Sequence, residues 1–194
     1  MESLTDGLPA GEAVLLVDPE WESDEEGAEP PIEAVVGMWP VGPDGTTGRF
    51  RSNPEYFPHF EESPSDPVDA LLRLALDGDA EMTRLRTVLR DSTFALAMNG
   101  DGNPLVDRSP DDVLCVIVAT SAPHRSRVAA PDWRLTDIDQ LLAVTAAEGY
   151  DALVNPGGPA PARLTVDFLR EAAGDPGQDS PGPQRPAGPG RDGR

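Results

Sequence analysis

Short runs of branched apolar residues, separated by turn-forming residues, predict β-strands in the first third of the chain. The run 13–17 is followed by Asp18 and Pro19, a second strand is expected over 32–39, and alternating polar and apolar residues indicate a third over 48–51. Strands bounded by Pro, Gly and Asp in this way are typical of antiparallel meanders. The pattern therefore predicts a β-meander of two to three strands near the N-terminus.

A helical pattern follows the meander. Asp66 is expected to cap a helix whose first turn contains Pro67, because proline has no N–H and none is needed at that position. Apolar residues then recur at helical spacing up to Gly78, which is expected to end the helix. A second amphipathic helix is predicted over 79–90.

Strand patterns return in the second half of the chain. A strand is expected over 93–98, followed by a hairpin turn at 99–102 and a return strand that starts near residue 105. Two nearly continuous apolar runs, 113–119 and 150–154, predict strands that are buried on both faces.

Helices over 136–147, capped by Thr136, and over 165–172 complete the predicted elements. The expected fold class is α+β, with a mixed β-sheet packed by three or four short helices. We expect two parts: residues 1–78 form an acidic N-terminal β-meander plus a helix, and residues 79–174 form an α+β domain.

The last segment, 175–194, differs from the rest in composition. Ten of its twenty residues are Pro or Gly, and it has no large apolar side chain. Such a segment buries too little surface to offset its conformational entropy, so we expect a disordered C-terminal tail.

The net charge of the chain limits the classes of molecule that it is expected to bind. The 194 residues include 15 basic residues, all arginine, and 35 acidic ones, for a net charge of −20. This acidity repels phosphate backbones and anionic lipids, so nucleic-acid binding is not expected. The chain has no apolar run long enough for membrane insertion and no secretory leader pattern, and we expect a cytoplasmic protein.

The acidity is concentrated in the first part of the chain. Residues 1–76 carry a net charge of −14, whereas residues 81–174 carry −4. The densest block, 20–29, is typical of a solvated loop, and a basic partner could also dock on it. A divalent-cation site is a third interpretation of this block. The candidate partner-binding residues are Trp21, Glu22, Asp24, Glu25 and Glu26.

Few residues suggest catalysis. Cys115 lies within an apolar strand, where a thiol behaves as a small apolar residue rather than as a nucleophile. His59 is expected to pack among aromatic residues, and His124 to lie exposed in a loop. The histidines show no metal-binding spacing, so no catalytic residue, metal or cofactor is expected.

One Gly-rich loop directly follows a buried strand, a place where α/β proteins often bind ligands. Its candidate ligand-binding residues are Asn155, Gly157 and Gly158. The loop also contains Pro156 and Pro159, which have no N–H to donate, so a purely structural turn is the other interpretation.

The order of segments in the second part resembles the SseB-type N-terminal domain. In that family a strand ends in a Phe-Thr-Ser-like motif, and after a helix a second strand ends in Leu-Asn-Pro-Gly. Here the segment 154–157 reads Val-Asn-Pro-Gly and matches the second motif. The segment 119–121 reads Ala-Thr-Ser, so Ala119 replaces the aromatic residue of the first.

Motifs of the first part resemble those of actinobacterial type VII secretion system-associated proteins. In chain order these motifs stand at 17–21, 35–39, 42–45, 53–56 and 66–69. Together with the second part, the resemblance covers roughly residues 13–173. It implies a non-enzymatic cytoplasmic accessory protein that acts by protein–protein binding, as chaperone, adaptor or assembly factor. The alternatives are an immunity-type inhibitor of a basic toxin and a small-molecule-binding or enzymatic domain that uses the 155–159 loop.

Overall fold

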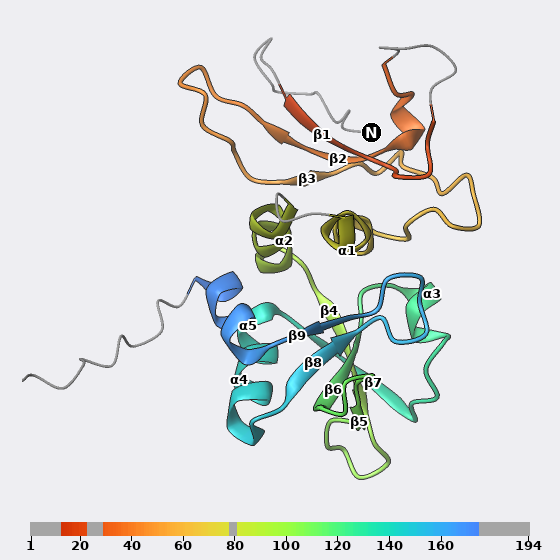
Figure 1. The fold of residues 1–194 in the computed structure, drawn as a ribbon, viewed down its shortest axis with the longest axis vertical. Helices are drawn as coiled ribbons and strands as arrows, with labels where there is room; N and C mark the ends of the chain where they lie inside the picture. The colour runs from red at the N-terminus through yellow and green to blue at the C-terminus, as the bar shows by residue number, and fades with distance from the viewer. Residues whose placement is uncertain (1–12, 23–28, 78–80, 175–194) are drawn as a thin grey trace, which may run out of the picture.

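A computed structural model describes residues 13–22, 29–77 and 81–174 (Figure 1). These residues form an α+β fold with five α-helices, a three-stranded sheet and a six-stranded mixed sheet, which confirms the expected fold class. The expected three or four helices become five because a four-residue helix in an Ala-Pro-His-Arg segment carries no apolar periodicity. The predicted disordered tail, residues 175–194, lies outside the described residues.

The N-terminal sheet is an antiparallel meander in the order β1-β2-β3. Its strands are β1 (Ala13–Val17), β2 (Val35–Pro40) and β3 (Arg51–Ser52). The second strand starts later than predicted because a 3-10 helix, η1 (Ile32–Ala34), forms after Pro31. This helix is closed by the Ala34 N–H, which donates to the Pro31 carbonyl at 2.9 Å.

Two helices lie between this sheet and the rest of the molecule (Figure 1). They are α1 (Pro67–Asp77) and α2 (Glu81–Arg90), and they pack against each other. Both agree with the sequence pattern. The predicted stop at Gly78 lies outside the described residues.

The larger sheet has the order β7-β4-β6-β8-β9, with β5 also paired to β6. Only the β6–β8 pair is parallel. The strands are β4 (Phe94–Met98), β5 (Val106–Arg108), β6 (Leu114–Ala119), β7 (Asp132–Thr136), β8 (Asp151–Val154) and β9 (Ala162–Leu164). The remaining helices are α3 (Ala122–Arg125), α4 (Ile138–Glu148) and α5 (Val166–Ala173).

One predicted helix start was wrong. Thr136 is the last residue of β7, and the cap of α4 is Asp137, whose carboxylate accepts from the Gln140 N–H at 2.8 Å. The Gln140 side chain in turn accepts from the Asp137 N–H, so the two residues form a capping box.

A single apolar core joins the two sheets. It runs from Trp39 in β2 through Leu71 in α1 and Leu89 in α2 to Phe94 in β4 and Leu141 in α4. The predicted boundary between residues 78 and 79 therefore falls between two helices that share this core. The opposite face of the larger sheet carries a smaller cluster that includes the buried Cys115, as expected for this thiol.

Candidate functional site

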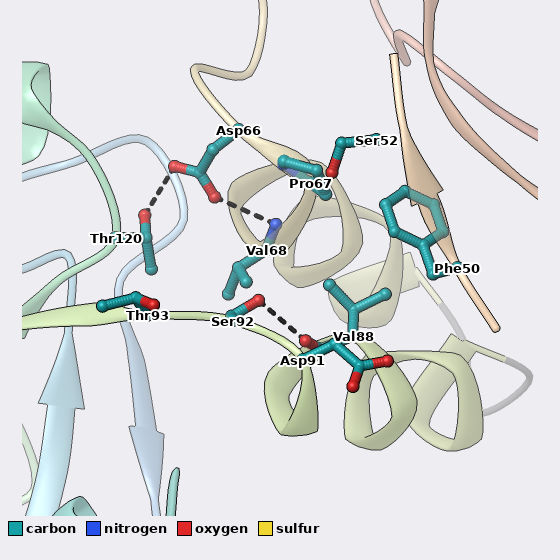
Figure 2. A pocket seen from close by; sticks show the side chains of 10 residues that line it. All are labelled: Phe50, Ser52, Asp66, Pro67, Val68, Val88, Asp91, Ser92, Thr93 and Thr120. Atoms are coloured by element: carbon teal, nitrogen blue, oxygen red, sulfur yellow. Dashed lines mark hydrogen bonds between the residues drawn. The ribbon is translucent and has the colours of Figure 1, made fainter. Parts of the chain in front are cut away.

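The start of α1 is tied to the end of β6 through Asp66 (Figure 2). Asp66 Oδ1 accepts from the N–H groups of Val68 at 2.9 Å and Asp69 at 3.0 Å, which confirms the predicted cap. Asp66 Oδ2 accepts from the Thr120 hydroxyl at 2.6 Å. One carboxylate thus caps a helix and links it to the larger sheet.

Asn155, a predicted ligand residue, completes this connection from β8. Its side-chain oxygen accepts from the Thr120 N–H at 3.0 Å, and its amide donates to the Thr120 hydroxyl at 2.9 Å. The residue is fully buried and has a positive φ of 52°, a conformation that Asn tolerates better than most residues. Its side chain therefore links the ends of β6 and β8 and does not reach solvent.

A second carboxylate of α1, Asp69, is buried beside two basic groups. Asp69 Oδ2 lies 3.1 Å from Arg73 Nη2 and 3.1 Å from His124 Nε2, and it accepts from the Ser65 N–H at 2.9 Å. Burial would raise the pKa of Asp69, but the contacts with His124 and Arg73 and the Ser65 N–H outweigh it. They lower the pKa from 3.8 to about 2, so the carboxylate is ionised at neutral pH.

The prediction of an exposed His124 was wrong. His124 belongs to α3, is only 3% exposed, and lies against Asp69 on one side and Gly158 on the other. Although Nε2 is close to Asp69, neither ring nitrogen has an aligned hydrogen-bond partner among the described residues. A Cβ atom at Gly158 would lie 3.0 Å from His124 Nδ1, so the glycine leaves room for the ring. No Ser, Thr or Cys side chain of the described part of the chain hydrogen-bonds to this imidazole.

A small pocket of about 250 Å³ opens beside this junction, at the ends of α1 and α2 (Figure 2). Its polar lining includes Asp66, Thr120, Asp91 and Ser92. Asp66 is bonded to Thr120, Asp91 lies 2.6 Å from Arg49 Nη2, and the Ser92 hydroxyl donates to the Val88 carbonyl at 2.7 Å. Its polar groups are thus largely engaged with the protein itself, which favours a structural role for the pocket.

Two further residues with potentially reactive side chains are Cys115 and His59. Burial raises the pKa of the Cys115 thiol, which opposes a nucleophilic role. His59 is exposed and makes an edge-to-face contact with Phe57 at 5.8 Å between ring centroids. Across residues 13–22, 29–77 and 81–174, no group of three His, Cys, Asp or Glu side chains could hold a metal ion.

None of the helices described has the length and apolar character needed to cross a bilayer.

The predicted partner-binding segment lies beside an aromatic hollow of about 180 Å³. We use this name for the depression lined by Asp18, Trp21, Pro31, Ala34, His59 and Phe60. Trp21 is half-buried and Glu22 exposed, whereas Asp24, Glu25 and Glu26 lie outside the described residues. Sequence reasoning missed the contribution of Phe60, because only the fold brings residues 57–60 to the acidic segment.

The predicted ligand loop divides between two environments. Asn155 and Gly158 face the Thr120 and His124 side chains inside the molecule. Gly157 instead lines a larger hollow on the open face of the six-stranded sheet, and its carbonyl accepts from Arg127 Nη1 at 3.1 Å. The structure therefore places only part of the predicted loop at a concave surface.

Comparisons of the chain with protein-family models, with curated proteins and with solved structures gave no match.

Proposed function

We propose that this chain is a non-enzymatic accessory protein of a type VII secretion system that works in the cytoplasm by binding another protein. The resemblance of its ordered sequence motifs to type VII secretion system-associated proteins supports the association. The observation that carries the binding role is the aromatic hollow with the acidic surface around it.

Large apolar side chains are exposed at this hollow. Phe60, which lines the hollow, is 54% exposed, and Phe57, which contacts the lining residue His59, is 67% exposed. Aromatic anchors surrounded by polar residues are typical of the residues that dominate protein–protein affinity. Trp21 and Pro31 line the hollow from the two ends of the acidic block, so the block begins and ends at this depression.

Exposed carboxylates stand close in sequence to the residues that line the hollow. The exposed glutamates of this region are Glu20, Glu22, Glu29, Glu33, Glu55, Glu61 and Glu62. None of them forms an ion pair with another described residue. A field of unpaired negative charge accelerates encounter with a basic partner and selects against acidic ones. The expected partner is therefore a protein with a basic rim and an apolar centre.

Affinity capture from an actinobacterial lysate tests the proposal. The baits are the full chain, the variant Phe60→Ser, and the control Leu135→Ser, which removes an apolar side chain that is 72% exposed on β7. We expect the full chain and the control to retain a protein encoded at the secretion locus, and Phe60→Ser to lose it. Capture should weaken as salt rises from about 50 mM to about 200 mM, because screening shortens the reach of the carboxylates.

Two results would count against the proposal. Recovery of no secretion component or substrate at either salt concentration would remove its basis. Specific recovery of a basic toxin would instead favour the immunity-type inhibitor. Circular dichroism of each bait checks that a loss of capture is not a loss of fold.

A further inference from the structure

A hollow of about 560 Å³ lies on the face of the six-stranded sheet opposite the apolar core shared with the long helices. Its floor includes Leu105, Ile117 and Leu153, which come from the β5 region, β6 and β8. Its walls include the 127–129 segment and the Pro156–Gly157 part of the predicted ligand loop. The volume is in the range of small-molecule sites, and an apolar floor is typical of them.

Four charged or hydroxyl side chains line this hollow, and two of them bind other side chains of the protein. Arg108 Nη1 lies 3.0 Å from Asp112 Oδ1, so its charge is compensated. The Ser109 hydroxyl donates to Asp111 at 2.6 Å. The remaining two, Asp107 and Arg127, form no ion pair with any described residue.

Arg127 is exposed, and its side chain makes one hydrogen bond within the described part of the chain. Its Nη1 donates to the Gly157 carbonyl at 3.1 Å, and no other side-chain nitrogen of Arg127 hydrogen-bonds within the described part of the chain. The guanidinium is thus held at the wall of the hollow with donors left for a carboxylate, which such a planar group binds in a bidentate manner.

Asp107 supplies the opposite charge. Its Oδ1 accepts from the Arg108 N–H at 2.7 Å, and its Oδ2 has no hydrogen-bond partner among the described residues. A purely anionic ligand would be attracted by Arg127 and repelled by Asp107. A ligand that carries both charges satisfies both groups.

We propose that this hollow binds an apolar zwitterion, that is, a free amino acid or a short peptide with apolar side chains. Its carboxylate lies on Arg127, its ammonium group on Asp107, and its side chains on Leu105, Ile117 and Leu153. The site is distinct from the aromatic hollow of the proposed function, because the two are lined by different residues.

NMR titration of the full, isotopically labelled chain tests this assignment. The probes are leucine, Leu-Leu, N-acetyl-Leu-Leu and Leu-Leu amide. We expect Leu-Leu to shift signals of Leu105, Ile117 and Leu153. Removing either terminal charge of the dipeptide should weaken binding about tenfold, as expected for loss of a hydrogen bond between charged groups. Comparison of the affinities of leucine and Leu-Leu shows whether the site prefers amino acids or peptides.

Matched variants separate the two charges. Arg127→Gln should weaken Leu-Leu about tenfold but leave Leu-Leu amide little changed, and Asp107→Asn should weaken Leu-Leu but leave the acetylated peptide little changed. Arg125→Gln is the control, because Arg125 is an exposed arginine of α3 that does not line the hollow.

The proposal is overturned if none of the four probes shifts these signals at about 10 mM. At that concentration even a ligand with a Kd of about 1 mM would occupy most of the sites. It is also overturned if Arg127→Gln and terminal amidation leave the Leu-Leu affinity unchanged. All three substituted side chains are exposed, and the spectrum of each variant shows directly whether the fold is kept.

Discussion

Asp69 links α1 to α3 through a carboxylate that is 1% exposed. It belongs to α1, contacts Arg73 one turn later, and reaches His124 in α3. A buried charge of this kind is tolerated only because basic partners and the Ser65 N–H compensate its lost hydration. Its stabilising effect therefore depends on its ionised form.

We expect the free energy of unfolding at acid pH to depend on the ionisation of Asp69. Because the pKa of Asp69 is lowered to about 2 in the folded state, its contribution is present above the ordinary value near 3.8 and is lost as the pH falls toward about 2. The shift corresponds to about 2 kcal/mol of unfolding free energy at neutral pH. Urea unfolding of the native chain and of Asp69→Asn between about pH 6 and about pH 2 measures it.

The difference in unfolding free energy between the two proteins should shrink as the pH falls. A difference that stays constant over this range would contradict the assignment. Asp167→Asn serves as the control, since Asp167 pairs with Arg170 on the surface of α5 and its side chain is 87% exposed. This variant should change stability by less than about 0.5 kcal/mol.

Gly158 is the second residue on which the junction depends. An added Cβ would lie 3.0 Å from the Asn155 carbonyl oxygen and 3.0 Å from the His124 ring. We expect Gly158→Ala to lower the unfolding free energy by about 1–3 kcal/mol, because neither the backbone nor the buried ring has room to move. Thermal and urea unfolding measure the effect.

Gly100→Ala is the matched control for this substitution. No atom lies within 4 Å of a Cβ at Gly100, and the residue is exposed in a turn. Its effect should stay within about 0.5 kcal/mol. Equal losses in the two variants would show that the contact with His124 has no energetic weight.

Single residues were predictable from sequence where their environment is local. Cys115 sits in an apolar strand, and Asp66 precedes its own helix, so neighbouring residues were sufficient. His124 was not predictable in this way. Its burial comes from Asp69 and Gly158, which are distant in sequence and meet it only in the folded chain.

Most helices and strands follow from their own apolar patterns, whereas β7, β9 and α3 do not, and β3 shares only Arg51 with the predicted run 48–51. Strand β7 lies at an edge of the sheet, and its Leu135 faces solvent, so its sequence shows no buried alternating face. Strand β9 has three residues, and α3 has four. Elements this short are set by their pairing with β8 and by contacts with β6, which a local pattern does not contain.

The attachment of α1 to the larger sheet can be measured by a double-mutant cycle on Asp66 and Thr120. Asp66→Ala removes a helix cap and the 2.6 Å hydrogen bond to Thr120, so we expect a loss of about 1–3 kcal/mol. Thr120→Val removes the hydroxyl and keeps the shape. The two losses should be non-additive by at least about 0.5 kcal/mol.

Strict additivity would show that the Asp66–Thr120 bond does not couple the helix to the sheet. Asp137→Ala gives a comparison within the same chain, because the Asp137 side chain caps α4 and forms no hydrogen bond with Thr120. Combined with Thr120→Val, it should be additive within about 0.5 kcal/mol.

At the scale of the whole molecule, the apolar core crosses the boundary predicted at residues 78 and 79. Trp39 in the three-stranded sheet and Leu89 in α2 belong to the same buried cluster as Phe94 in the six-stranded sheet. The sequence pattern suggested two parts because charge and element type change along the chain. It contained no sign of how α1 and α2 fill the space between the sheets.

We expect the two sheets to unfold together. In one variant Trp39 is the only tryptophan, and in the other Trp133 is, with Phe at the remaining tryptophan positions. Their fluorescence reports the small sheet and β7 respectively. Within each variant, the fluorescence midpoint should coincide with the midpoint from far-UV circular dichroism, because a shared core makes unfolding cooperative. A fluorescence midpoint that differs from the circular dichroism midpoint of the same variant would show two independent domains.

The acidic surface and the aromatic hollow lie on the N-terminal part of the molecule, and we propose that the partner binds there. Photocrosslinking in an actinobacterial host that carries a type VII secretion locus tests this most directly. A photoreactive residue at Phe60 should give an adduct with a protein encoded at that locus, and the same residue at Leu135, which is 72% exposed on β7, should not. Absence of an adduct at Phe60, or equal adducts at both positions, would contradict the account.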